Sequence, residues 1–251
     1  MITASRRGTT LVLTVDRPRS KNALTRATIA ELTRAFSALP SDVRAVVLTG
    51  AGGTFVSGGD LRELRGVNDH ATTRAFCDEG RAMCDAIEEA PAPVLCAIEG
   101  HALGGGAELA CAADLRVMAE DAVLGFRQTR MGVTTAWGTW ARLAAELGPS
   151  RAADLVLTAR DLTAREALDL GLVQRTAAPG GALAEALVVA GEIAAGAPRA
   201  ASAVKELLRA SRRSPELRAL ERERFVDTWT SDDHARAVEA WFEGRPPRWG
   251  G

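Results

Sequence analysis

Two glycine-rich segments constrain the fold of this chain most strongly, because each directly follows a short apolar run that is rich in β-branched residues. The segment "GAGGTFVSGGDLREL" (50–64) follows "VRAVVLTG" (43–50), and "GHALGGGAELACAADL" (100–115) follows "PVLCAIEG" (93–100). Continuous apolar runs of this length are typical of parallel strands buried on both faces. We therefore predict that both turns lie at the carboxyl edge of one parallel sheet, where α/β proteins bind ligands.

The chain alternates between strand and helix patterns over about its first 130 residues. Further strands are predicted at 9–15 and 114–120, and helices at 25–40 and 71–90. Beyond residue 136 the chain is expected to be almost entirely helical, with amphipathic stretches at 136–148, 150–159, 163–171, 182–196 and 216–229. The predicted fold class is α/β with a helical C-terminal third.

Charge and hydropathy exclude several classes of partner. The 251 residues carry a net charge of −1, from 31 basic and 32 acidic side chains, so no positive field attracts nucleic acid or an anionic membrane. Charges interrupt every apolar run before the length of a membrane span, and "MITASRRGTT" lacks the apolar core of a signal peptide. We expect a cytoplasmic protein with a small-molecule or protein partner, and neither nucleic acid nor membrane.

The four cysteines predict neither disulfides nor a metal site. Cys77, Cys84, Cys96 and Cys111 show no CxxC spacing, and only three histidines are available to join them. Buried free thiols are the simpler interpretation. We expect no metal and no redox cofactor.

In the second segment a strand is followed by a glycine turn and then by the start of a helix. This order places unpaired N–H groups and the positive end of a helix dipole at the turn. A phosphate loop is excluded, because no GK[ST] follows the glycines of 100–106 and the GxGxxG spacing is absent. One glycine turn alone could serve only the packing of helix on strand. Two turns at the same sheet edge can supply two backbone donors to one oxyanion. Glu108 would suit the helix dipole in any case, but it lies beside both turns, and we expect His101 to be structural.

Several segments together resemble the enoyl-CoA hydratase/isomerase (crotonase) superfamily over nearly the whole chain. In order they are "RPRSKNAL", "VVLTGAGGTFVSGGDLREL", "PVLCAIEGHALGGGAELACAADLRV", "LTARDLTAREALDLGLV" and "WTSDDHARAVEAWFEGRPPRWG". The resemblance implies a crotonase-like spiral of ββα units (1–190) and a helical C-terminal oligomerisation region (191–251). It also implies a homotrimer or a dimer of trimers, and an acyl-CoA substrate that brings coenzyme A as part of its thioester, with no permanently bound cofactor.

The resemblance assigns roles to particular residues. The N–H groups of Gly59 and Gly105 would hold the thioester oxygen, Glu108 would transfer a proton, and Asp60 would brace the first turn. The other substrate-binding or CoA-binding positions that it implies are Arg19, Ser20, Ser57, Leu61, Gln128, Thr135 and Trp137.

The sequence departs from the hydratase pattern at two places. Hydratases of this family pair two glutamates around one water, and the second falls at Gln128, whose amide cannot exchange a proton at neutral pH. The family turn "GxxPGAGG" appears as "GVTTAWGT", in which Thr134 or Thr135 replaces the proline and Trp137 adds bulk to the acyl pocket. The helix start "AELxxAxD" (107–114) and the later "MGxxxxWG" (131–138) also resemble the alkylmalonyl-CoA decarboxylase branch, which keeps the glutamate at the first position and loses the second.

Decarboxylation of a short alkylmalonyl-CoA is therefore the first hypothesis, since it needs an oxyanion hole and one proton donor. The chain contains no tyrosine, which excludes tyrosine-dependent variants. Arg127 or Arg130 would bind the substrate carboxylate through a bidentate contact. The alternative is that both arginines are solvated or have a structural role. Enoyl-CoA hydration or isomerisation is the alternative, and a non-catalytic acyl-CoA-binding subunit is a third. The tryptophans expected to pack or to contact another subunit are Trp229, Trp241 and Trp249.

Overall fold

The computed structural model describes residues 1–249. In chain order its elements are β1 Ile2–Arg7, β2 Thr10–Val15, η1 Pro18–Ser20, α1 Arg26–Ser37, β3 Ala45–Gly50, α2 Leu61–Leu64, α3 His70–Glu89, β4 Val94–Ile98, β5 His101–Leu103, α4 Gly105–Ala112, β6 Leu115–Ala119, β7 Val123–Gly125, η2 Gln128–Met131, α5 Thr139–Leu147, α6 Pro149–Thr158, β8 Asp161–Thr163, α7 Ala164–Asp169, β9 Arg175–Ala177, α8 Ala182–Ala195, α9 Pro198–Arg212, α10 Pro215–Trp229 and α11 Asp232–Phe242. The α/β prediction is confirmed.

The four strands expected from apolar runs form the centre of a six-stranded sheet of order β1-β2-β3-β4-β6-β9. β1 and β2 make an antiparallel hairpin, and the remaining pairs are parallel. Val46 on β3 pairs with Val94 on β4. Because these neighbours are parallel, both glycine turns leave the sheet at the same carboxyl edge, as predicted.

The prediction of an almost wholly helical region beyond residue 136 is wrong at two short strands. β8 pairs with β7 in a second sheet of order β5-β7-β8, and β9 joins the large sheet beside β6. Each contains three residues and pairs with a segment far away in the sequence, so no local period of hydrophobicity reveals it. β1 was not predicted either, because its residues are mostly exposed at the sheet edge.

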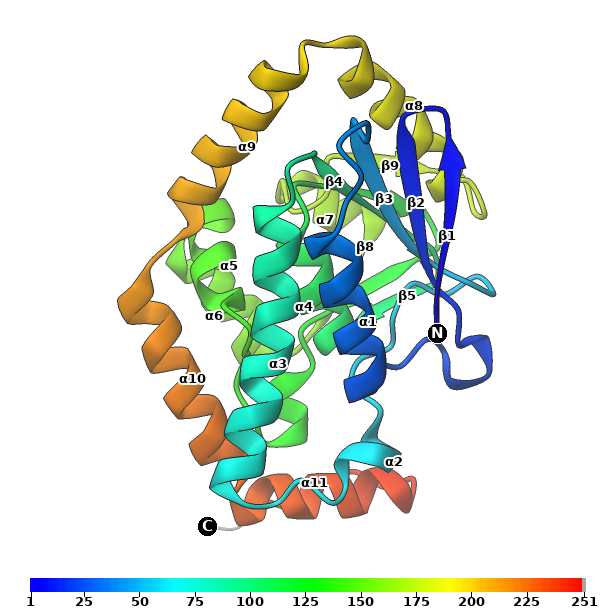
Figure 1. Cartoon of the computed structure of the whole chain (residues 1–251). Helices are drawn as coiled ribbons and strands as arrows, with labels where there is room; N and C mark the ends of the chain where they lie inside the picture. Colours follow the sequence, from blue (N-terminus) through cyan, green and yellow to red (C-terminus); the bar gives the residue numbers. More distant parts are fainter. Residues whose placement is uncertain (250–251) are drawn as a thin grey trace.

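Helices cover the sheet and then extend around the molecule. α8 packs against β3 and β4, and α1 packs against α3. Figure 1 shows α9 and α10 running along one side of the molecule, and α11 crossing near the lower end of α3. The predicted boundary between residues 190 and 191 falls inside α8. No single helix of residues 1–249 is long and apolar enough to cross a membrane, although α8 and α9, bent by 114° relative to each other, meet the length and composition criteria as a pair.

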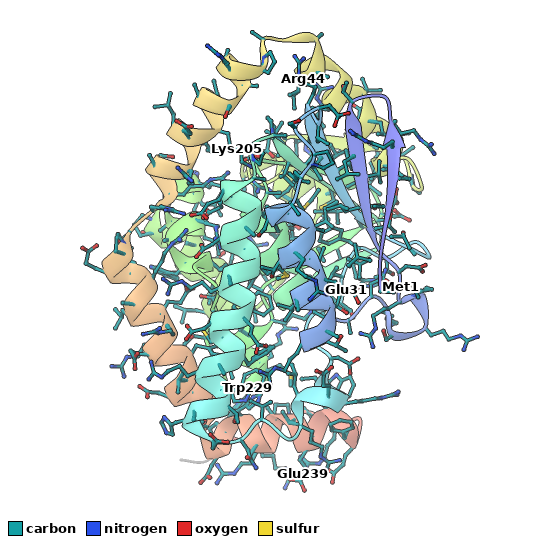
Figure 2. All side chains as sticks on the ribbon, in the orientation of Figure 1. Met1, Glu31, Arg44, Lys205, Trp229 and Glu239 are labelled. Carbon is teal, nitrogen blue, oxygen red and sulfur yellow. The ribbon has the colours of Figure 1, made fainter. Side chains whose placement is uncertain are left out.

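Buried charges attach the C-terminal helices to the core. Lys205 on α9 donates to the Ile87 carbonyl (2.9 Å) and to Asp114 (2.6 Å), and Figure 2 shows it beside the upper part of α3. Arg218 on α10 and Arg142 on α5 both pair with the buried carboxylate of Glu88, at 2.8 and 2.7 Å. Removing one partner of such a group costs about 3–5 kcal/mol, so these contacts fix the position of α10 against the core.

Candidate active site

The first glycine turn is held by the segment that precedes α1. The Leu24 N–H donates to the Gly58 carbonyl, and the Asp60 N–H donates to the Leu24 carbonyl, both at 2.8 Å. Gly58 has φ of +114°, a conformation that favours glycine. The N–H of the intervening Gly59 faces away from this pairing and has no acceptor within residues 1–249.

Asp60 contacts the turn and not the cavity beside it. Its Oδ1 accepts the N–H of Arg62 (3.2 Å) at the start of α2, and its Oδ2 accepts from the Arg17 guanidinium (3.0 Å). The Asp60 side chain therefore connects α2 to the loop after β2, which is the geometry expected of a brace.

The second glycine turn is joined to the first by backbone hydrogen bonds. The Val56 N–H donates to the His101 carbonyl, and the Leu103 N–H donates to the Val56 carbonyl, both at 3.0 Å. α4 begins at Gly105, so the Gly105 N–H is one of the unpaired donors of a helix start. A Cβ on Gly105 would lie 3.6 Å from the Gly59 nitrogen. Both free N–H groups therefore border one small space, as an oxyanion hole requires.

Glu108 lies one turn into α4 and is 3% exposed. Its Oε2 accepts from the Ala136 N–H (3.0 Å) and from the Thr139 hydroxyl (2.8 Å), and its Oε1 accepts from the Gln128 amide nitrogen. Burial, followed by the nearby Glu221 carboxylate, raises the pKa of Glu108 to about 8, although the three donors oppose this change. A carboxyl with this pKa can both give and take a proton near neutral pH.

Gln128 holds Glu108 with one end of its amide and leaves the other end free. The side chain is buried, and its Oε1 has no hydrogen-bond partner within the described part of the chain. Because an unsatisfied buried acceptor is costly, this oxygen is available to a water or to a donor on the substrate.

A cavity of about 240 Å³ adjoins both turns and Glu108. Trp137 forms part of its wall, adopts φ of +57° and packs its indole where a side chain on Gly80 would lie, since a Cβ there would be 2.1 Å from the ring. Phe76 meets Trp137 edge to face, with ring centroids 6.1 Å apart. The Trp137 indole also lies against the second glycine turn, since a Cβ on Gly105 would be 2.9 Å from the ring, so an aromatic wall directly adjoins the Gly105 N–H.

The structure gathers most of the predicted site residues and leaves four outside the cavity, namely Asp60, Thr135, Arg19 and Ser20. Those that line it are Ser57, Gly59, Leu61, Gly105, Glu108, Gln128 and Trp137. Thr135 does not line the cavity, contrary to its predicted place, because its hydroxyl donates to Glu221 (2.7 Å). Arg19 is exposed on η1, and Ser20 donates to the Arg17 carbonyl (3.1 Å); contact of either with CoA stays a prediction.

Sequence reasoning missed the contribution of the C-terminal helices to the cavity wall. Phe225 and Trp229 on α10, with His234 and Trp241 on α11, line it together with Phe76. The Trp229 indole N–H also donates to the Val67 carbonyl (2.8 Å), and Figure 2 shows this tryptophan near the lower end of α3. Trp229 and Trp241 were expected to pack or to contact another subunit, and nothing local in the sequence places them at this cavity.

The two arginines near Gln128 differ in their partners. Arg127 pairs with both carboxylate oxygens of Asp161 through its Nε and Nη2. Arg130 is exposed at the cavity and makes no ion pair within residues 1–249. No cluster of three or more His, Cys, Asp or Glu side chains in this range could hold a metal ion.

Two free backbone donors beside a buried carboxyl, at the carboxyl edge of an α/β core, define a class of enzymes that stabilise an oxyanion and move a proton next to it. The chain belongs to the enoyl-CoA hydratase/isomerase family of the crotonase superfamily, whose sequence profile matches residues 5–251. It is accordingly an enzyme that acts on CoA thioesters.

Individual relatives support this membership. The short-chain-enoyl-CoA hydratase of Clostridium acetobutylicum is 32% identical over 243 residues (95% of this chain, 93% of the relative). An enoyl-CoA hydratase of Mycobacterium tuberculosis is 32% identical over 251 residues (96% and 93%). An enoyl-CoA hydratase/isomerase structure from Pseudoalteromonas atlantica superposes with a TM-score of 0.86 at 29% identity, covering 99% of both chains.

Proposed function

We propose that the enzyme acts on an enoyl-CoA through an enolate, with Glu108 as its only proton-transfer group, and that moving the double bond is the reaction it is best built to catalyse. The observation that carries this proposal is that Glu108 is the one carboxyl lining the cavity among residues 1–249, beside the N–H groups of Gly59 and Gly105. The hydratase names of the relatives support an enoyl-CoA substrate.

One carboxyl is sufficient for this isomerisation. With the thioester oxygen held by the two N–H groups, ionised Glu108 removes a proton from C2 of a 3-enoyl-CoA, and the electron pair forms an enolate. Protonated Glu108 then returns that proton to C4, so the double bond moves to C2–C3. Two fixed donors lower the barrier to the enolate by about 3 kcal/mol each.

The same site could also catalyse hydration if a water binds at Gln128. Its free Oε1 can accept a hydrogen bond from a water, but the amide cannot take the proton, so Glu108 would have to activate the water and also protonate C2. Hydration is therefore expected to be slower than isomerisation.

Decarboxylation of a short alkylmalonyl-CoA is the second candidate, and Arg130 is the observation that favours it. Arg130 lines the cavity and makes no ion pair within residues 1–249, and a guanidinium there suits a substrate carboxylate. Loss of carbon dioxide would leave the enolate of a saturated acyl-CoA, held by the same two N–H groups, and protonated Glu108 would give its proton to C2.

The test is a substrate panel followed over a range of pH. A 3-enoyl-CoA, crotonyl-CoA and methylmalonyl-CoA are each incubated with the wild type, with Glu108→Gln, and with Glu120→Gln as an exposed control. We expect the 3-enoyl-CoA to form the conjugated 2-enoyl-CoA, at a rate that rises with pH through about 8 because Glu108 must be ionised. Glu108→Gln should abolish this activity and Glu120→Gln should retain it.

Two results would overturn the isomerase proposal. Carbon dioxide release from methylmalonyl-CoA as the main activity, falling as the pH rises above about 8, would favour decarboxylation. Water addition to crotonyl-CoA that is faster than isomerisation would favour the hydratase.

A further inference from the structure

The loop between η2 and α5 is held from two sides by two buried carboxylates. Glu108 on α4 accepts from the Ala136 N–H and the Thr139 hydroxyl, at 3.0 and 2.8 Å. Glu221 on α10 accepts from the Thr135 hydroxyl and the Trp140 N–H, both at 2.7 Å. Loop 135–140, defined to include the first two residues of α5, thus gives its two inner donors to Glu108 and its two outer donors to Glu221.

Glu221 holds the loop through buried hydrogen bonds and not through a surface ion pair. It is 7% exposed, and its one oxygen Oε1 accepts both loop donors. α10 is itself fixed against the core by Arg218, which pairs with Glu88 and Asp85 at 2.8 and 2.9 Å. The loop that carries two donors to Glu108 is thus anchored to a C-terminal helix whose own place is set by buried charge.

We propose that Glu221 is a positioning residue for Glu108, which holds loop 135–140 in place and connects α10 electrostatically to the proton-transfer group. This inference rests on the role proposed for Glu108. Glu221 touches no reacting atom, since it does not line the cavity and acts through the loop.

The electrostatic part of the connection has a definite sign. Like charge on Glu221 raises the pKa of Glu108, and burial raises the pKa of Glu221 itself while the Arg142 guanidinium and the loop donors oppose that rise. Burial also raises the pKa of the Cys77 thiol to about 12 and that of Cys84 further, so both thiols stay neutral. Further ionisable groups lie near this region. Arg142 on α5 and Arg218 on α10 lie against Gly138 of the loop and pair with Glu88 on α3. On the cavity side are Arg127, Arg130 on η2 and His234 on α11.

Removing the charge of Glu221 while keeping a hydrogen-bond acceptor separates its electrostatic effect on Glu108 from its role in anchoring the loop. In Glu221→Gln an amide oxygen can still accept from Thr135 and Trp140, but the like charge is gone. The pKa of Glu108 should therefore fall by about one pH unit, the scale on which interacting carboxyls couple. In Glu221→Ala the loop loses its anchor, and kcat should fall more than in Glu221→Gln.

The experiment is a carbon-13 NMR titration of glutamate carboxyl groups in the whole protein without substrate, with Glu108 assigned by its loss in Glu108→Gln. Glu223→Gln, on the exposed side of the same helix where Glu223 pairs with Arg74, is the matched control and should leave the Glu108 midpoint unchanged. A lower midpoint in Glu221→Gln alone supports the proposal. An unchanged midpoint in the folded variant overturns it.

A second variant keeps the proposal testable if Glu221→Gln does not fold. In Glu221→Met a neutral side chain of similar length fills the buried space, so the like charge is gone and the Glu108 midpoint should again fall. A Glu108 midpoint that stays or rises in the folded variant refutes the connection. Neither titration depends on which acyl-CoA reaction is catalysed, so failure of the proposed isomerase activity would be seen separately.

Discussion

The hydroxyl of Thr139 should control the pH at which Glu108 works. It donates to Glu108 Oε2 over 2.8 Å in a buried setting, and replacing it in Thr139→Val keeps the shape of the side chain. A hydrogen bond to a charged group contributes about 1.5–3 kcal/mol. At about 1.4 kcal/mol for each pH unit, its loss should raise the pKa of Glu108 by about one to two units.

The direction follows from which form the hydroxyl stabilises. Thr139 donates to the ionised carboxylate, so removing it favours the protonated form, and the midpoint should move upward from about 8. At pH 7 the ionised fraction, and with it the rate of proton removal, should fall by about tenfold or more. At high pH, where Glu108 is ionised in both proteins, the rates should converge.

Exchange of the C2 protons of butyryl-CoA in deuterium oxide measures this step directly, because a saturated acyl-CoA can be neither hydrated nor isomerised. The exchange rate is followed by proton NMR across pH for the wild type, Thr139→Val and Thr134→Val. Thr134 lies on the same loop but donates its hydroxyl to the Thr135 carbonyl (2.8 Å), so its variant should keep the wild-type midpoint. A Thr139→Val midpoint that stays or falls, or an equal shift in Thr134→Val, would refute the reasoning.

Three further substitutions have definite expected outcomes. Gly80→Ala places a Cβ 2.1 Å from the Trp137 indole, so the ring must shift; calorimetry should show a loss of about 1–3 kcal/mol, with weaker binding of acyl-CoA. Glu108→Gln should stabilise the protein against urea by a few kcal/mol at pH 9 and little at pH 4, because the pKa raised from 4.5 to about 8 makes the ionised carboxylate increasingly costly as pH rises between these values. Glu88→Ala removes the closer carboxylate of the buried Arg142 guanidinium, at 2.7 Å, leaving only Asp85 at 3.7 Å, and should cost about 3–5 kcal/mol in a urea titration at pH 7.

Each of these has an outcome that contradicts it. Unchanged stability and affinity in Gly80→Ala would mean that the indole is not confined by α3. Equal stabilisation by Glu108→Gln at pH 4 and pH 9 would mean that burial does not raise its pKa. Asp154→Ala serves as the control for Glu88→Ala, because its ion pair with Arg160 is exposed and should contribute at most about 1 kcal/mol; an equal loss in both would refute the importance of burial.

The part of the site formed by the two glycine turns and Glu108 could be predicted from the sequence. Parallel strands β3 and β4 end at the same edge, so two glycine turns after two apolar runs must bring Gly59 and Gly105 together, and Glu108 follows within one helical turn. These relations involve neighbouring elements and a regular period. The same local patterns predicted the central strands and most of the helices.

The other part of the site depends on contacts that no local pattern encodes. His234 and Trp229 reach the cavity because α10 and α11 return to it more than a hundred residues after Glu108. Thr135 was placed in the acyl pocket by its position in a motif, but the buried carboxylate of Glu221 takes its hydroxyl instead. Three-residue strands such as β8 form only when a distant partner is present.

The amide at position 128 is consistent with a buried carboxyl that must change its protonation state. A second carboxylate in contact with Glu108 would add like charge to the site where burial and Glu221 already oppose ionisation. Gln128 instead donates to the ionised form, and its amide can rotate so that its oxygen accepts from the protonated form. One neutral side chain can therefore satisfy Glu108 before and after proton transfer, which a reaction that removes and returns the same proton requires.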